Sequence, residues 1–112
     1  LVIDDDRMVR DYMRMVLQRS DFEVMAPCSA TEALSVIDQP DPGIDAVVSD
    51  IDMPDMDGFT FARAVIQRFP KMPILMVSGI LPEEQDEGRF AFLRKPFGPA
   101  DLTRAVGRLL GT

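Results

Sequence analysis

The sequence predicts a three-layer α/β fold in which helices cover both faces of a parallel sheet. Short apolar runs alternate with segments of helical periodicity, most of the runs stop at a polar or acidic residue, and no linker or repeat interrupts the alternation. A chain of 112 residues has room for one hydrophobic core, so we expect one domain over residues 1–112. Because the chain begins inside the apolar run 1–3, we interpret this run as a first strand that has been cut into.

The composition narrows the possible functions. A formal net charge of -7 argues against direct nucleic-acid binding, because phosphate contacts need clustered Lys and Arg. The absence of His excludes a His nucleophile and argues against zinc, which favours oxygen-ligated metals such as magnesium. Cys28 has no second cysteine to pair with, so we expect a reducing, cytoplasmic setting. No apolar run approaches the ~18 residues of a membrane span, and no signal-peptide pattern opens the chain.

The first strand, residues 1–3, runs into Asp4, Asp5 and Asp6. Asp6 is suited to cap a helix whose apolar positions keep one-face spacing: Val9, Tyr12, Met13, Val16 and Leu17. Met8 and Met15 lie off that stripe, which leaves them on another face of the same helix.

The middle of the chain predicts two strands and one helix. Residues 22–28 form a second, less clear strand, and the capping box from Ser29 to Glu32 begins a helix that residues 40–43 stop. The apolar run 44–48 then delivers Asp50 to the end of a buried strand, before a loop that Pro54 and Gly58 bracket.

The last part of the chain predicts two strands and three helices. A helix follows Gly58 and ends at Pro70, and the apolar run 73–77 is a strand that stops at Ser78. Residues 82–88 hold at most two turns of a fourth helix, a brief strand over 90–93 meets Lys95, and the last helix starts near Pro99.

This order repeats a β-α unit five times, which predicts a flavodoxin-like, doubly wound parallel sheet with strand order 2-1-3-4-5 and a shortened fourth helix. Strands 1 and 3 are neighbours in that sheet, so Asp4, Asp5 and Asp50 converge at one crevice beyond the carboxyl ends of the strands. An Asp at a strand end is often only a turn former. The surrounding groups argue for more than a turn here.

Three close carboxylates repel one another by about 4 kcal/mol per pair at an effective dielectric of about 20, and a bound magnesium ion relieves this repulsion. A carboxylate beside magnesium is a competent nucleophile for phosphorus. Ser78 offers a hydroxyl and Lys95 an ammonium to the phosphoryl oxygens at the same edge of the sheet. These residues therefore predict a site for phosphoryl transfer.

Over its whole length the chain resembles the receiver domain of two-component response regulators, through the segments VIDDD, VVSDIDMPDMDG, MVSG and LRKPF. The resemblance implies Asp50 as phospho-acceptor, Asp4 and Asp5 as the acidic pair for Mg²⁺, and the Asp52 carbonyl as a further ligand. It implies Ser78 as switch hydroxyl, Lys95 as phosphate partner in a cis bond to Pro96, and Phe92 as switch aromatic without the usual hydroxyl. It also implies self-catalysed phosphorylation and dephosphorylation of Asp50. The implied partner is a histidine kinase or histidine phosphotransfer protein, docked where Met8 and Met15 lie.

The chain departs from that pattern between Ser78 and Lys95, where sixteen residues leave a short fourth helix. Shortened receivers with SG after the fourth strand resemble those of hybrid histidine kinases or single-domain relays. In receivers this region usually forms part of the output and dimer surface, so the short fourth helix argues against the common fourth-helix dimer, and we predict no oligomeric state.

Two alternatives stay open: an unphosphorylated scaffold of the same fold, and a Mg-dependent aspartyl phosphatase of the haloacid-dehalogenase type. The phosphatase motif begins at Asp50 and Asp52, but Pro54 stands where Thr or Val is needed. An EF-hand loop fails, because the register that fits Gly58 puts Met53 at the first ligand position.

Overall fold

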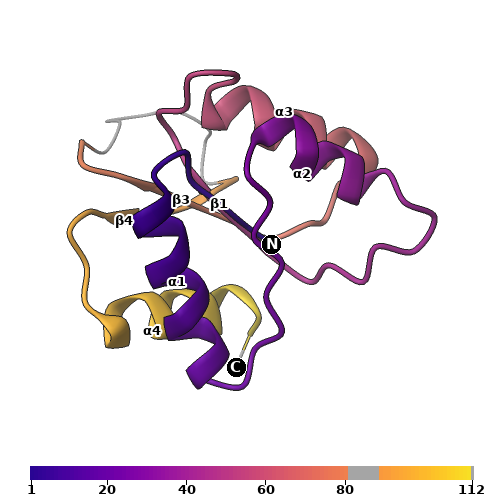
Figure 1. Cartoon of the computed structure of the whole chain (residues 1–112). Coiled ribbons are helices and arrows are strands. Elements are labelled where there is room, and N and C mark those ends of the chain that lie inside the picture. Colours follow the sequence, from indigo (N-terminus) through magenta and orange to yellow (C-terminus); the bar gives the residue numbers. More distant parts are fainter. Residues whose placement is uncertain (81–88, 112) are drawn as a thin grey trace.

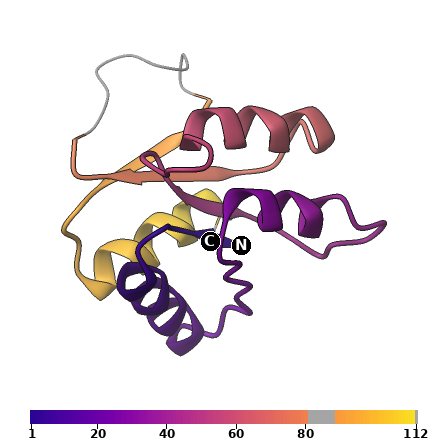
Figure 2. The same ribbon diagram turned by 45° about the horizontal axis from the view of Figure 1, so that its top comes forward.

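The computed structural model describes residues 1–80 and 89–111, in which parallel strands form one sheet in the order β1-β2-β3-β4. The strands are β1 (Val2–Ile3), β2 (Val47–Asp50), β3 (Ile74–Ser78) and β4 (Ala91–Arg94). Helices α1 (Arg7–Arg19) and α4 (Pro99–Leu109) cover one face, and α2 (Ala30–Ile37) and α3 (Gly58–Arg68) cover the other (Figure 1). Figure 2 shows the same division of the helices from a second direction.

Side-chain caps fix where three of the helices begin. Asp6 accepts a hydrogen bond from the backbone amide of Met8 at the start of α1, as the sequence predicts. Ser29 Oγ accepts from the amide of Glu32 at the start of α2. Asp57 Oδ1 accepts from the amide of Thr60 over 2.8 Å, which sets the start of α3 directly after the loop that follows Asp50.

The alternation of side chains along the strands divides the core into two clusters. Val47 and Ile74 face α2 and α3, whereas Val48 and Leu75 face α1 and α4. All five residues of β3 are buried, in agreement with the prediction of a strand covered on both faces. Phe61 of α3 is fully buried in the first cluster.

The parallel register brings the carboxyl ends of the strands to one edge of the sheet. Ile3 pairs with Ser49, Asp50 with Val77, and Ser78 with Arg94. The residues after β1, the last residues of β2 and β3, and Lys95 after β4 therefore lie at the same edge, as predicted for a parallel α/β sheet.

The predicted second strand, residues 22–28, is not confirmed, so neither are the five strands nor their full order. The segment runs beside β1 and the amide of Val2 donates to the carbonyl of Met25 over 2.8 Å, but residues 22–28 do not form a strand of the sheet. Asp21 has a φ of 68° just before the segment, and Pro27 within it lacks an N–H, so both ends limit strand pairing.

The predicted shortened helix falls on residues 82–88, outside the described residues. In the described part of the chain, no helix has the length and apolar character needed to cross a membrane.

Candidate functional site

Three carboxylates converge at the carboxyl end of the sheet. Asp4 and Asp5 follow β1 and Asp50 ends β2, and one oxygen from each lies within 4.8 Å of the others. Asp4 and Asp50 are buried, with 1% and 5% of their surface exposed, whereas Asp5 is open to solvent. The structure thus brings together the three acids that the strand order places in one crevice.

Lys95 joins this cluster from the end of β4. Its Nζ donates to Asp4 Oδ2 over 2.8 Å and to Asp50 Oδ1 over 3.2 Å. The other oxygen of Asp4, Oδ1, accepts from the amide of Asp6 over 2.9 Å. The Lys95-Pro96 peptide bond is cis, as the resemblance implies. The ammonium therefore lies between the two buried carboxylates and offsets part of their repulsion.

These contacts change how the groups bind protons. Burial raises the pKa of Asp50 from 3.8 to about 6, the charge of Asp4 adds to this rise, and Lys95 opposes it. Burial alone lowers the pKa of Lys95, but its hydrogen bond to Asp4 and the charges of Asp4 and Asp50 outweigh burial and raise that pKa. At neutral pH the carboxyl group of Asp50 is therefore mostly ionised, and the Lys95 amine beside it is protonated.

Ser78 and Asp52 lie at the rim of the same crevice. Ser78 is 1% exposed, its Oγ donates to Asp52 Oδ2 over 3.5 Å, and it accepts from the amide of Ile80 over 3.3 Å. The backbone amide of Lys95 donates to the carbonyl of Ser78 over 2.8 Å. The hydroxyl-bearing end of β3 and the residue that carries the ammonium are therefore tied together.

Gly58 fixes the loop that carries Asp50. Its amide donates to the carbonyl of Ile51 over 2.7 Å. A Cβ at this position would lie 2.3 Å from the carbonyl oxygen of Asp50 and 2.8 Å from the Cα of Ile51. Only a residue without a side chain lets α3 begin this close to the end of β2.

The predicted switch aromatic and partner surface lie farther out. Phe92 on β4 is partly buried, and its ring packs against Phe59 of α3 at 6.3 Å. Met8 and Met15 are 82% and 44% exposed on α1, which agrees with their position off the apolar stripe. Both methionine side chains are therefore accessible to another protein at the surface of α1.

The donor set fits a divalent cation that prefers oxygen ligands. Three carboxylates supply hard oxygen atoms within a few ångströms, and the exposed Asp5 leaves the cluster open to solvent, so waters can complete the coordination of an ion such as Mg²⁺. The acidic cluster can therefore bind a metal.

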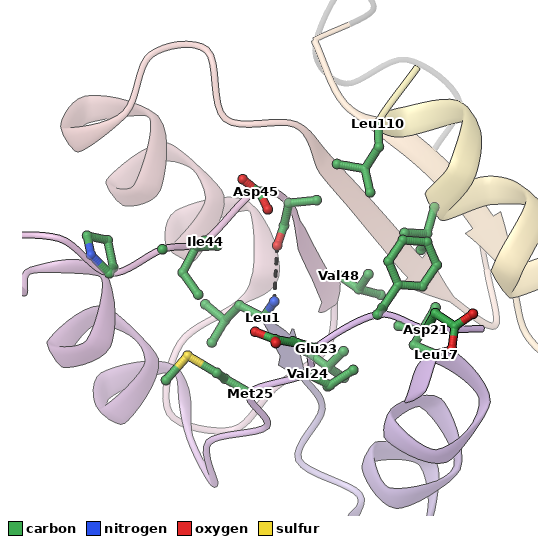
Figure 3. Close-up of a pocket in the computed structure, with 16 residues that line it drawn as sticks. Leu1, Leu17, Asp21, Glu23, Val24, Met25, Ile44, Asp45, Val48 and Leu110 are labelled. Carbon is green, nitrogen blue, oxygen red and sulfur yellow. Dashed lines mark hydrogen bonds between the residues drawn. The ribbon is translucent and has the colours of Figure 1, made fainter. Parts of the chain in front are cut away.

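A cavity of about 570 Å³ lies at the opposite end of the sheet, where β1 and β2 begin (Figure 3). The backbone nitrogen of Leu1 donates to the carbonyl of Ala46 there over 3.1 Å. Asp4, Asp5 and Asp50 do not line this cavity, so it is separate from the acidic site.

The sequence did not reveal the α1 residues that support the site. Arg10 Nη1 donates to the carbonyl of Asp4 over 3.0 Å, and the hydroxyl of Tyr12 donates to the carbonyl of Phe97 over 3.3 Å. Tyr12 is one of the apolar-stripe positions of α1, and periodicity gives no sign that its hydroxyl reaches a loop 85 residues away.

A family model described as the response regulator receiver domain matches residues 1–107 of the chain. The chain therefore belongs to the response regulator receiver family. It is 35% identical over 112 residues to the C4-dicarboxylate transport transcriptional regulatory protein DctD of Rhizobium meliloti, covering 96% of this chain and 24% of that protein. It is 33% identical over 107 residues to the putative two-component response regulator ARR21 of Arabidopsis thaliana, covering 93% of this chain and 18% of that protein.

Solved structures agree with this assignment. The chemotaxis response regulator CheY4 of Vibrio cholerae superposes with a TM-score of 0.86 at 30% identity, over 97% of this chain and 95% of that chain. The receiver domain of the hybrid histidine kinase CckA gives a TM-score of 0.84 at 27% identity, with the same coverage of 97% and 95%. The chain spans only 12% to 24% of the first curated relatives it matches.

Proposed function

We propose that this domain is a phosphorylation-dependent signalling receiver in which Asp50 accepts a phosphoryl group from a phosphohistidine on a partner protein. The observation that carries the proposal is the position of Asp50: a buried carboxylate at a strand end, between an acidic pair and the ammonium of Lys95. This combines a nucleophile with groups that balance negative charge, which phosphoryl transfer requires.

In the transfer, an oxygen of Asp50 forms a bond to phosphorus while the bond from phosphorus to the imidazole nitrogen breaks. The electron pair of the broken bond stays on the imidazole of the donor. A bound Mg²⁺, held by Asp4, Asp5, Asp50 and the carbonyl of Asp52, would supply charge neutralisation for the carboxylates and the phosphoryl oxygens. Later, a water oxygen bonds to phosphorus while the bond from phosphorus to the Asp50 oxygen breaks, which releases inorganic phosphate and restores the free Asp50 carboxylate.

Lys95 and Ser78 have separate roles in this proposal. Lys95 leaves Asp50 and pairs with a phosphoryl oxygen, and the Ser78 hydroxyl donates to another. Because the backbone amide of Lys95 donates a hydrogen bond to the backbone carbonyl of Ser78, we expect the ends of β3 and β4 to shift together. Phe92 lies on β4, so a shift of this edge changes its packing against Phe59 and alters the surface that a partner contacts.

The proposed phosphodonor is a histidine kinase or a histidine phosphotransfer protein that docks on α1. The exposed Met8 and Met15 support this surface, because flexible thioether side chains adapt to a partner. The similarity to the receiver domain of a hybrid histidine kinase supports the same class of donor.

The direct test is incubation with Mg²⁺ and phosphoramidate or acetyl phosphate, followed by mass spectrometry of the intact protein. We expect a mass gain of one phosphoryl group that is absent in Asp50→Asn and retained in Asp55→Asn, an exposed acid of the same loop. No mass gain in the wild type would favour an unphosphorylated scaffold. Steady release of phosphate from unrelated phosphoesters would favour a phosphatase.

The proposed role of Lys95 is tested by Lys95→Ala. We expect phosphorylation to be slower yet measurable, and binding of a partner to lose its dependence on phosphorylation. A pull-down with phosphorylated and unphosphorylated protein identifies that partner in the wild type. Unchanged affinity of the partner for the phosphorylated variant would contradict this role.

A further inference from the structure

Helix α1 forms hydrogen bonds to the backbone next to both partners of the ion pair between Asp4 and Lys95. Arg10 donates to the backbone carbonyl of Asp4 over 3.0 Å. Tyr12, two positions along the same helix, donates to the carbonyl of Phe97 over 3.3 Å, and Phe97 follows Lys95 by two residues. The rings of Tyr12 and Phe97 also pack at 6.1 Å with an interplanar angle of 41°.

This second contact matters because the Nζ of Lys95 must reach two carboxylates at once, Asp4 Oδ2 at 2.8 Å and Asp50 Oδ1 at 3.2 Å. A displaced backbone at Lys95 would force the side chain to give up one of these two contacts. On one side, the amide of Lys95 is fixed by the carbonyl of Ser78. On the other side the chain turns toward α4, and Tyr12 holds this turn through the Phe97 carbonyl and ring. Tyr12 and Phe97 both pack against the core cluster under α1 and α4, so the contact has a rigid base.

We propose that Tyr12 is a positioning residue for phosphoryl transfer: it holds the segment after Lys95 so that the ammonium stays between Asp4 and Asp50. The proposal rests on the proposed function of the site. Tyr12 touches none of the reacting atoms and acts through Lys95. The helix that exposes Met8 and Met15 thus also sets the position of the ammonium.

The chain offers a matched control for this role. Ser20 Oγ and Thr103 Oγ1 lie 3.1 Å apart and form another side-chain hydrogen bond between the region of α1 and α4. This pair joins the C-terminal end of α1 to α4 and does not contact the segment after Lys95. Ser20→Ala therefore removes a tie between the two helices and leaves the placement of Lys95 unchanged.

The experiment measures the rate at which phosphoramidate phosphorylates Asp50 at saturating Mg²⁺, since this small donor needs no docking surface on α1. We expect Tyr12→Phe to slow the reaction about threefold and Tyr12→Leu about tenfold, because the first loses only the hydroxyl contact and the second also loses the ring. Ser20→Ala should keep the wild-type rate. Urea unfolding of each variant shows that the compared proteins are folded, and Tyr12→Phe keeps the test decisive if Tyr12→Leu does not fold.

A double-mutant cycle separates positioning from a general effect on the fold. In a Lys95→Ala background, Tyr12→Phe and Tyr12→Leu should cause no further slowing, because the group they position is gone. Equal slowing with and without Lys95, or wild-type rates in folded Tyr12 variants, would overturn the inference alone. A wild-type protein that takes up no phosphoryl group on Asp50 would overturn the proposed function and this inference with it.

Discussion

The raised pKa of Asp50 predicts that its charge destabilises the metal-free fold. The carboxylate is 5% exposed, and burial together with Asp4 raises its pKa from 3.8 to about 6 despite Lys95. At about 1.4 kcal/mol per pKa unit, this difference corresponds to about 3 kcal/mol. We therefore expect Asp50→Asn, which keeps the shape and removes the charge, to raise the free energy of unfolding by about that amount at pH 8 without metal.

The sign of the pH dependence follows from the two pKa values. Above pH 6 the carboxylate is ionised in both states, so the folded protein carries the full penalty. As the pH falls through about 6 the folded state binds the proton first, and by 3.8 the unfolded state binds it too. The advantage of the Asn variant should therefore shrink to about 1.5 kcal/mol at pH 5.

The assay is urea unfolding in EDTA at pH 8 and pH 5, with Asp55→Asn as the control. Asp55 is exposed on the same loop, so its neutralisation should change stability by no more than about 0.5 kcal/mol. Added Mg²⁺ should narrow the gap between wild type and Asp50→Asn, because the wild type binds the ion more tightly. An Asn variant no more stable than wild type in EDTA at pH 8, or a gap that stays constant to pH 5, would refute the reasoning.

Three further predictions concern the loop and the acidic pair. Gly58→Ala should lower the free energy of unfolding by about 2–4 kcal/mol, because the added Cβ would meet backbone atoms. Gly79 has open space around it, so Gly79→Ala should change the free energy of unfolding by less than about 1 kcal/mol. Thermal unfolding of both variants checks this. Asp57→Ala should lose about 1 kcal/mol through the missing cap of α3. Its hydrogen bonds to Thr60 lower the pKa of Asp57, so the wild-type advantage should be present above pH 3.8 and disappear as the pH falls through that lowered value, as urea unfolding across this range can show. Mg²⁺ should raise the melting temperature of the wild type, and Asp5→Asn should remove most of this rise, whereas an equal rise in both proteins would contradict a role for Asp5 as ligand.

The strand ends could be predicted because burial and polarity change abruptly there. The apolar runs before Asp50 and Ser78 are long enough to be recognised, and both residues end strands in the structure. Residues 22–28 alternate in exposure as an edge strand does, but the segment is not a strand of the sheet, and its hydrogen bond to β1 joins Val2 to Met25. Sequence periodicity reports which side chains are buried, and backbone pairing at an edge also depends on local φ values such as that of Asp21.

The acidic residues of the candidate site could be predicted from the sequence, whereas the residues that hold its backbone in place could not. Asp4, Asp5 and Asp50 follow from strand order alone, because parallel strands present the same ends to one edge. The contact of Tyr12 with Phe97 depends on how two helices pack, and no local pattern encodes a hydroxyl that reaches a carbonyl 85 residues away. Contacts of this kind become visible only when the whole fold is assembled.

The pairing of Asp4 with Lys95 joins residues 91 positions apart in the chain. During synthesis, a nascent chain that already exposes Asp4, Asp5 and Asp50 still lacks its ammonium until nearly the entire domain has left the ribosome. A fragment that ends before Lys95 therefore keeps the carboxylates of Asp4 and Asp50 without the ammonium that lies between them. In such a fragment nothing from β4 offsets their repulsion, so the charge balance at this end of the sheet depends on the last strand being in place.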